Sequence, residues 1–335
     1  MAGKIFHSNL RNQLIGTGVI MAGWVVGSYV PNTLGVKFAK KIIESKSPYC
    51  KSISAEPETE ALLDEVIRDI NAHQDRPVKK EGIEFLQTNM AYQSYLHKGN
   101  SSTGAIIGFP IGTRCNAKDV FFLHYSAPGS EEMADFCILS REGKKFIFAR
   151  EIFYVEDSYV MFRFLLGLGL IAAGSLMHFV INSSLDNLKE MKIHIARLDN
   201  KSKTTIEELI RKYKSRAHKQ RIMTCVLVCL LGAHLYKLLV TDHNWKLEKE
   251  ADEKVANLGL EYQRGGFEFY EKLLQGNVFS FARLGKSCGC DSEGNVVQSK
   301  YLIFRKHIPL TARYQYFTTL MEKNDPSKIE ELTSS

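Results

Sequence analysis

The chain has 335 residues, and 44 Lys and Arg against 37 Asp and Glu give a formal charge of +7. An aromatic content of 10% excludes a disordered chain, and the lack of a fixed short period excludes a fibrous repeat. The apolar residues gather in three segments. The sequence therefore predicts a membrane protein with two soluble parts, at 31–160 and 241–335.

Three segments with at most one charge each have the composition of membrane spans. They cover residues 14–30, 164–181 and 222–240. About 20 apolar helical residues cross the hydrocarbon core, so the second and third segments are long enough and the first is short. The alternatives are a buried core helix for each segment and a secretory signal for the first. We expect three transmembrane helices, and the spacing of Gly23 and Gly27 would let another helix pack closely.

The charges around these segments predict the orientation in the membrane. Segment 1–13 is basic, and segment 182–221 carries 11 Lys and Arg against 5 acidic residues. Because positive charge is retained on the side from which insertion starts, we expect both soluble parts on the opposite face. The first acidic residue is Glu44, and a basic, acid-free N-terminus is typical of mitochondrial targeting. We interpret the basic stretch 201–221 as a solvated helix near anionic lipid head groups, and we expect no nucleic-acid binding.

The soluble parts are predicted to be mostly helical with a small sheet, which is the α+β class. Helices are expected where apolar residues recur at helical spacing: 58–72, 140–157 with Ser140 as N-cap, 246–262, 266–275 after a break at Gly265-Gly266, and a closing helix after Pro309. Strands are expected where short apolar runs end in turn residues: 104–110, 120–125, and both sides of a turn within 279–305.

The seven cysteines do not form a metal-binding constellation. Cys288 and Cys290 are separated by a single residue, which is the wrong spacing for a zinc knuckle. The alternatives to a structural role are a bond between these two residues and a redox function in an oxidising compartment. We expect no metal and no cofactor.

The region around Arg150 has the outline of a zinc-peptidase helix without its ligands. Zincins carry H-E-x-x-H, in which two His bind zinc and the Glu is the general base. The same frame here reads Arg150-Glu151-x-x-Tyr154. Downstream, the stretch Glu248 to Asp252 is similar to the third-ligand region of HtpX/CAAX-type gluzincins, with Glu248 at the ligand position. The stretch His307 to Arg313 is similar to a His-Pro-x-x-x-x-Arg segment of those enzymes. The resemblance implies a degenerate metallopeptidase-like domain built from two chain segments.

The residues that replace the ligands cannot bind zinc in the usual way. Arginine has no lone pair to donate, and a phenol with a pKa of about 10 is a poor ligand. We therefore expect no catalytic residue. We predict that Arg150 pairs with Glu248 or Glu151, in a degenerate site that also contains Tyr154 and locks this helix to the C-terminal segment. The alternatives are an Arg150 side chain that points into solvent and an active membrane metallopeptidase with an unrecognised ligand set.

A longer part of the chain resembles the transmembrane protein 177 family. The resemblance lies in Ile138-Leu139-Ser140-Arg141-Glu142, Lys145-Phe146, Ala149 to Glu156, and Gly104-Ala105-Ile106-Ile107-Gly108-Phe109-Pro110 upstream. The long charged segment between the last two spans departs from the family pattern. The resemblance implies a non-catalytic factor of the mitochondrial inner membrane with its soluble parts in the intermembrane space. It also implies a role in early maturation of cytochrome c oxidase subunit two, alongside that subunit's assembly chaperone.

Overall fold

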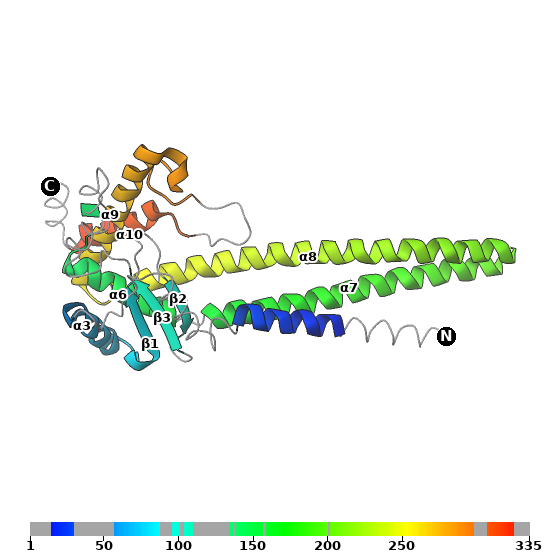
Figure 1. The fold of residues 1–335 in the computed structure, drawn as a ribbon, viewed down its shortest axis with the longest axis horizontal. Coiled ribbons are helices and arrows are strands. Elements are labelled where there is room, and N and C mark those ends of the chain that lie inside the picture. Colours follow the sequence, from blue (N-terminus) through cyan, green and yellow to red (C-terminus); the bar gives the residue numbers. More distant parts are fainter. Residues whose placement is uncertain are drawn as a thin grey trace. The chain divides into compact units, whose positions relative to one another are not determined.

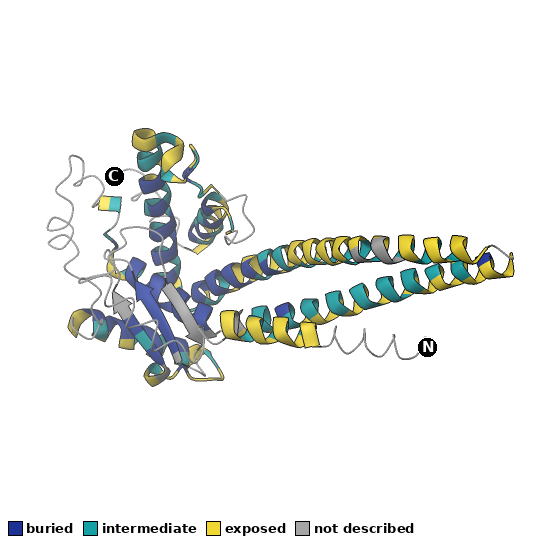
Figure 2. Ribbon diagram, turned by 45° about the vertical axis from the view of Figure 1, so that its right-hand side comes forward, coloured by how far each residue is buried: buried dark blue, intermediate teal, exposed yellow. Residues whose placement is uncertain are grey.

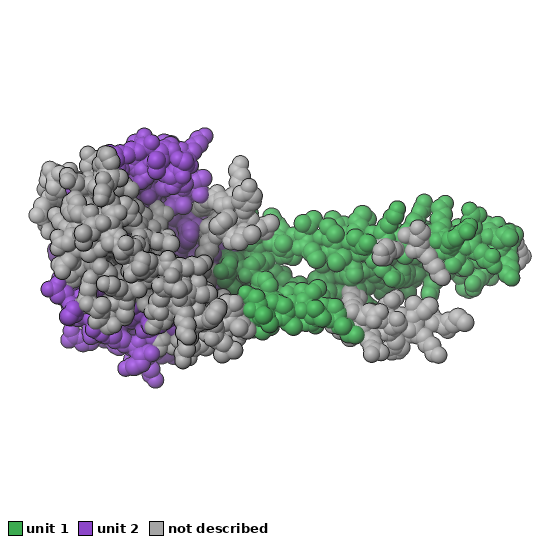
Figure 3. Space-filling model, viewed as in Figure 1, with its two compact units in different colours: residues 1–29, 161–240 green, residues 30–160, 241–335 purple. Residues whose placement is uncertain are grey.

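The fold is mostly helical with one three-stranded sheet, which confirms the expected α+β class (Figure 1). The computed structural model describes residues 15–29, 57–87, 96–100, 104–109, 135–136, 138–156, 159–199, 202–297 and 307–324. The chain divides into two compact units, coloured in Figure 3: residues 1–29 with 161–240, and residues 30–160 with 241–335. Each unit is therefore built from segments that lie far apart in the sequence.

The first unit contains the apolar parts of two helices that are long enough to cross a membrane, α7 (Tyr159–Leu198) and α8 (Lys203–Ala256). The last part of α8, residues 241–256, belongs to the second unit. The two helices contain the predicted spans 164–181 and 222–240. Within the basic segment 182–221, residues 182–198 and 203–221 are helical. Most side chains along the two apolar segments are exposed or half-buried, as Figure 2 shows, which is the pattern of helices that face lipid.

The first apolar segment forms a shorter helix, with residues 15–24 α-helical and Val25–Tyr29 forming the π-helical turn η1. Its apolar part, Ile15–Gly27, is shorter than a membrane span. The described structure therefore has two candidate spans and one shorter apolar helix, and the third predicted span stays a prediction.

The contact of this short helix with its own unit is made by Trp24. Its ring packs edge-to-face on Tyr236, with 5.5 Å between the ring centroids. Gly167 allows the approach, because a Cβ there would lie 2.2 Å from the Trp24 ring. At Gly23 and Gly27, the predicted packing positions, no described atom outside their own helix lies within 4 Å of where a Cβ would be.

The second unit contains a sheet of three strands: β1 (Ile83–Gln87), β2 (Leu96–Asn100) and β3 (Gly104–Phe109). β3 lies in the middle, parallel to β1 and antiparallel to β2. Ile106 and Ile107 point to opposite faces and are both buried, so both faces of β3 are covered. The strand predicted at 104–110 is confirmed, whereas that at 120–125 lies outside the described residues.

The end of α8, residues 241–256, and four further described helices complete the second unit: α3 (Pro57–His73), α6 (Arg141–Glu156), α9 (Leu260–Leu284) and α10 (Leu310–Asn324). α3, α6 and α10 confirm the predicted helices. The N-cap of α6 is Ser140, as predicted, because its Oγ accepts a hydrogen bond from Gly143 N at 3.1 Å. Ser140 also donates through its backbone N to Glu268 on α9 at 2.8 Å, which fixes the start of α6 against that helix.

The predicted helix break at Gly265-Gly266 is wrong. The chain turns at Gly259, which has a left-handed φ of 133°, and Gly265 and Gly266 lie inside α9. They allow close packing, because a Cβ on Gly265 would lie 2.1 Å from the Glu142 carbonyl oxygen. A Cβ on Gly266 would lie 2.4 Å from the Phe317 ring.

The strand predicted at the start of 279–305 is also wrong, because α9 continues to Leu284. The helix ends at Gly285, whose positive φ of 57° favours glycine and whose backbone N–H donates to the Phe281 carbonyl oxygen. The predicted turn follows, with a single bridge between Cys290 and Val296. Cys288 and Cys290 are free thiols, and burial together with the Cys288 thiol raises the pKa of Cys290 to about 11. Residues 298–306 lie outside the described residues.

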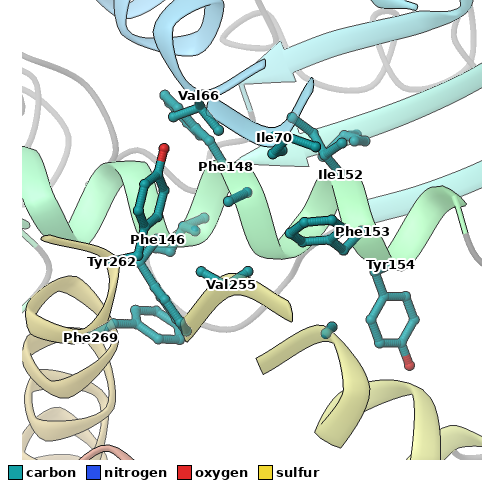
Figure 4. Packing of buried hydrophobic residues seen from close by; sticks show 14 of the residues in the cluster. Val66, Ile70, Phe146, Phe148, Ile152, Phe153, Tyr154, Val255, Tyr262 and Phe269 are labelled. Atoms are coloured by element: carbon teal, nitrogen blue, oxygen red, sulfur yellow. The ribbon is translucent and has the colours of Figure 1, made fainter. Parts of the chain in front are cut away.

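The hydrophobic core of the second unit is centred on α6, whose side chains are buried around most of the helix (Figures 2 and 4). α6 packs against α3, α9, β2 and β3. Phe146 contacts three aromatic rings, those of Phe269, Tyr270 and Phe317, with centroid distances between 5.1 and 5.7 Å. A helix that is enclosed on all sides usually has apolar residues all round. α6 also buries charged residues, and each of these needs a partner of opposite charge or a hydrogen bond.

Candidate functional site

Arg150 lies on α6 and is buried, at 7% exposure. Its Nη1 is 2.7 Å from Oε1 of Glu151, and its Nε is 3.3 Å from Oδ1 of Asp252 on α8. Both acidic residues are buried as well. Burial opposes the charged guanidinium, but Tyr270 and the surrounding carboxylates raise the pKa of Arg150 well above its ordinary value. The side chain is therefore a fixed positive charge inside the core.

Asp252 is the centre of this buried cluster. Oδ2 of Asp252 accepts from Nε of Arg313 at 2.7 Å, and Oδ1 accepts from Nη2 of Arg313 at 2.7 Å. The Tyr270 hydroxyl donates to Oδ1 at 2.9 Å, and the Arg313 guanidinium lies over the Tyr270 ring at 4.7 Å. This two-pronged geometry is the strong form of an arginine–carboxylate pair. One carboxylate of α8 thus binds α6, α9 and α10 together.

Glu248 lies one helical turn before Asp252 and holds the start of α10. It is 2% exposed and accepts from Nδ1 of His307 and from Ile308 N at 3.0 Å. Its Oε2 lies 3.5 Å from Nη1 of Arg313. Burial raises the pKa of Glu248, but the His307 hydrogen bond and the charge of Arg313 outweigh it and lower the pKa to about 2. Glu248 is therefore ionised at any pH near neutrality.

The structure brings three of the four predicted site residues into this cluster. Arg150 and Glu151 form a direct ion pair. The Glu248 carboxylate contributes to the field at Arg150, and its hydrogen bonds go to the residues before α10. Tyr154, the fourth, is buried in the hydrophobic core one turn further along α6 (Figure 4).

Sequence reasoning missed Asp252, Tyr270 and Arg313. The signal for Asp252 is its position four residues after Glu248, on the face of α8 that also carries the buried Ala251 and Val255. Arg313 was part of the His-Pro-x-x-x-x-Arg resemblance without a role of its own. Nothing in the local sequence around Tyr270 marks its hydroxyl as a hydrogen-bond donor to a residue of α8.

A second buried cation, Lys145, ties α6 to α3 and α9. Lys145 Nζ lies 2.8 Å from Glu65 on α3, 2.7 Å from Glu261 on α9, and 3.5 Å from Asp69. The Tyr262 hydroxyl also donates to Asp69, at 2.7 Å. Burial opposes the ammonium charge, but the hydrogen bonds to Glu261 and Glu65 raise the pKa of Lys145. The central helix is therefore held through charge at two positions.

The chemistry of the Arg150 cluster is ion pairing between helices. The guanidinium groups of Arg150 and Arg313 supply the positive charge that balances the buried carboxylates of Glu151, Glu248 and Asp252. Among the residues that the structure describes, no group of three or more His, Cys, Asp and Glu is placed to hold a metal ion. Removing one partner of a buried ion pair is strongly destabilising, because it leaves the other charge uncompensated.

Comparison with curated proteins finds similarity to transmembrane protein 177 of two organisms. Transmembrane protein 177 of Homo sapiens is 25% identical over 272 residues, which cover 77% of this chain and 76% of the relative. Transmembrane protein 177 of Rattus norvegicus is 23% identical over 269 residues, with the same coverage. The chain resembles transmembrane protein 177. Together with the two long apolar helices, this resemblance supports a membrane protein.

No protein-family model matches the chain. No solved structure matches it either. The likeness to HtpX/CAAX-type gluzincins therefore rests on the sequence motifs alone.

Proposed function

We propose that the chain is a non-catalytic assembly or stabilising factor of the mitochondrial inner membrane. It supports early maturation of cytochrome c oxidase subunit two, together with the assembly chaperone of that subunit. The resemblance to transmembrane protein 177 supports the membrane and family parts of the proposal, and the partners are inferred from the same resemblance. The observation that carries the non-catalytic part is the ion pair between Arg150 and Glu151 in the zincin frame.

The charges of the cluster argue against peptide hydrolysis. A catalytic zinc site has three protein ligands and a water, and its Glu base must be able to take up a proton. Arg150 stands at the first ligand position and has no lone pair. Its Nη1 lies 2.7 Å from the Glu151 carboxylate, and such a charge disfavours protonation of that base. Glu248, at the third ligand position, is bound to His307 and Ile308 N.

The proposal includes the way in which the chain crosses the membrane. Two spans in α7 and α8 return the chain to the side from which it entered, so the segments before and after them can build one soluble unit, as residues 30–160 and 241–335 do. With residues 14–30 as a third span, the basic segment 182–221 lies on the matrix side near lipid head groups. The second unit then lies in the intermembrane space.

Affinity purification of the tagged full-length chain from a mild-detergent extract of mitochondria, followed by mass spectrometry, tests the partners. We expect subunit two and its chaperone to be enriched over a control purification with an unrelated inner-membrane protein that carries the same tag. If both are absent while the chain is intact in the inner membrane, the proposed partners are wrong.

The non-catalytic part has its own test. In cells that lack the protein, Glu151→Gln should restore the lifetime of newly made subunit two in proportion to the amount of folded variant, because a structural residue acts only through folding. A catalytic base would lose function at constant abundance. The competing hypothesis, an active membrane metallopeptidase, predicts stoichiometric zinc in the purified protein and peptide cleavage that a chelator abolishes.

A further inference from the structure

Beyond the apolar span, α7 continues as a charged helix with one face turned toward α8. Nε2 of His178 lies 3.3 Å from the Arg221 carbonyl oxygen, and the Arg221 guanidinium lies 2.7 Å from Asp186. Ala196 is buried. The segment from Asn182 to Asp199 carries three acidic residues and three Lys or Arg, so it belongs to the aqueous part of the helix.

A second apolar face runs along the same segment and is exposed. It consists of Leu188, Met191, Ile195 and Leu198, which we call the outer stripe of α7. Their exposures are 50%, 53%, 48% and 69%. At 100° per residue, the outer stripe lies roughly 160° around the helix from the residues that contact α8. The helix α8 therefore does not cover it.

The neighbouring part of α8 shows the opposite pattern. Among its described side chains between Lys203 and Arg221, none of the large apolar ones is exposed. Of the two helices, α7 therefore carries the exposed apolar stripe and α8 does not. A helix that faces only water would carry polar residues at these four positions.

Lipid cannot cover the whole stripe. α7 is one continuous helix, and Leu198 lies 17 residues beyond Ile181, the last residue of the predicted span. That distance is about 26 Å along the helix axis. The head-group layer adds only about 5–8 Å to each side of the hydrocarbon core, so the far end of the stripe needs a protein partner.

The spacing of the stripe identifies the shape of that partner. Steps of three, four and three residues match the core positions of a heptad over a short length, so the stripe fits the apolar face of one packed helix. The membrane also supplies the orientation. Two copies of α7 inserted the same way are parallel, with like residues at equal depth, so the stripe of one copy faces the same stripe of the other.

The flanking charges are compatible with this arrangement. In a parallel pair in register, the g position directly before Leu188 or Ile195, the a-type core residues, faces the e position five residues later in the other copy. His194 then faces Asp199, and Asn187 faces Lys192. None of these pairs places like charges opposite each other. We infer that the outer stripe is a dimer interface, at which α7 of a second copy of this chain forms a parallel coiled coil outside the membrane.

Cysteine crosslinking of the full-length chain in membranes tests this interface. Single substitutions at the four stripe positions, Leu188→Cys, Met191→Cys, Ile195→Cys and Leu198→Cys, are compared with Glu190→Cys and Arg197→Cys, two exposed positions on the same helix. All seven native cysteines, of which Cys225 and Cys229 are exposed in the span, are changed to Ser in every variant, and a short bismaleimide joins thiols that meet. We expect crosslinked dimer at the stripe positions, several-fold above the two control positions.

A second variant separates a specific interface from random collision. Ile195→Glu together with Leu198→Glu places like charges at the seam and should abolish the Leu188→Cys crosslink, while the half-exposed positions leave the fold of the chain intact. Equal crosslinking at stripe and control positions, or none at any of them, would refute the interface. A stripe adduct with a different protein in native membranes would refute the assignment of a second copy.

Discussion

Replacing Asp252 by asparagine keeps the size of the side chain and removes the charge that compensates two buried guanidinium groups. Asp252 accepts from Arg313 twice at 2.7 Å and lies 3.3 Å from Arg150. Breaking a buried pair by removing one partner costs about 3–5 kcal/mol. For a domain of this size, that loss lowers the midpoint of thermal unfolding by about 6–20 °C.

The alkylation of Cys290 provides a local assay. This thiol is 5% exposed in the second unit, so its reaction with a maleimide, followed by peptide mass spectrometry during heating, reports unfolding there. The matched control is Glu261→Gln, which makes the same carboxylate-to-amide change at a side chain that is 41% exposed. Lys145 keeps Glu65 as a partner in that variant, so we expect a loss below about 1 kcal/mol. If Asp252→Asn costs no more than this control, the cluster does not hold the unit together.

Three further changes test separate features, the first by unfolding followed with circular dichroism, because a thiol is not alkylated at acidic pH, and the other two with the same alkylation assay. The free energy of unfolding should fall by about 3 kcal/mol as the pH drops from about 5 to about 2, because the folded pKa of Glu248, about 2, lies below its ordinary 4.5. In the Glu248→Gln variant this dependence on pH should be weaker. An unchanged dependence would show that other groups cause it. Gly265→Ala should destabilise the protein, since its Cβ would lie 2.1 Å from the Glu142 carbonyl oxygen, whereas Gly232→Ala, with open space, should not. Ser140→Ala should cost about 1 kcal/mol through the lost N-cap, and a neutral result would mean that the cap contributes little.

The sequence predicts those elements whose signals are local. Helical spacing of apolar residues, with Ser140 as a cap and Pro309 before a helix start, is sufficient for α3, α6 and α10. β2, with the sequence Leu-His-Lys-Gly-Asn, has a single large apolar residue and becomes a strand because β3 pairs with it. The Gly265-Gly266 pair shows a different limit of prediction from the sequence. A glycine that breaks a helix and a glycine that lets a helix approach another look alike until the neighbour, here Glu142, is known.

The candidate site, like the fold, could be predicted from the sequence only in part. A carboxylate partner for Arg150, either Glu248 or Glu151, could be predicted because a guanidinium in the zincin frame matches the geometry of a carboxylate. Asp252 lies in the run Glu-Lys-Glu-Ala-Asp-Glu-Lys, which is typical of a solvated helix. Its burial depends on α9 and α10, which contribute Tyr270 and Arg313 from later in the chain.

The insertion of a helical hairpin between the two halves of the second unit sets an order of events during synthesis. Arg150 and Asp252 are 102 residues apart, so a ribosome that adds about 5–20 residues per second produces the cation about 5–20 s before its partner. During that interval both apolar helices must emerge and enter the membrane. A nascent chain in which only one of the two helices inserts would leave Asp252 on the wrong side of the bilayer and Arg150 uncompensated. Completion of the soluble unit therefore reports that the two helices have not been separated by insertion of one alone.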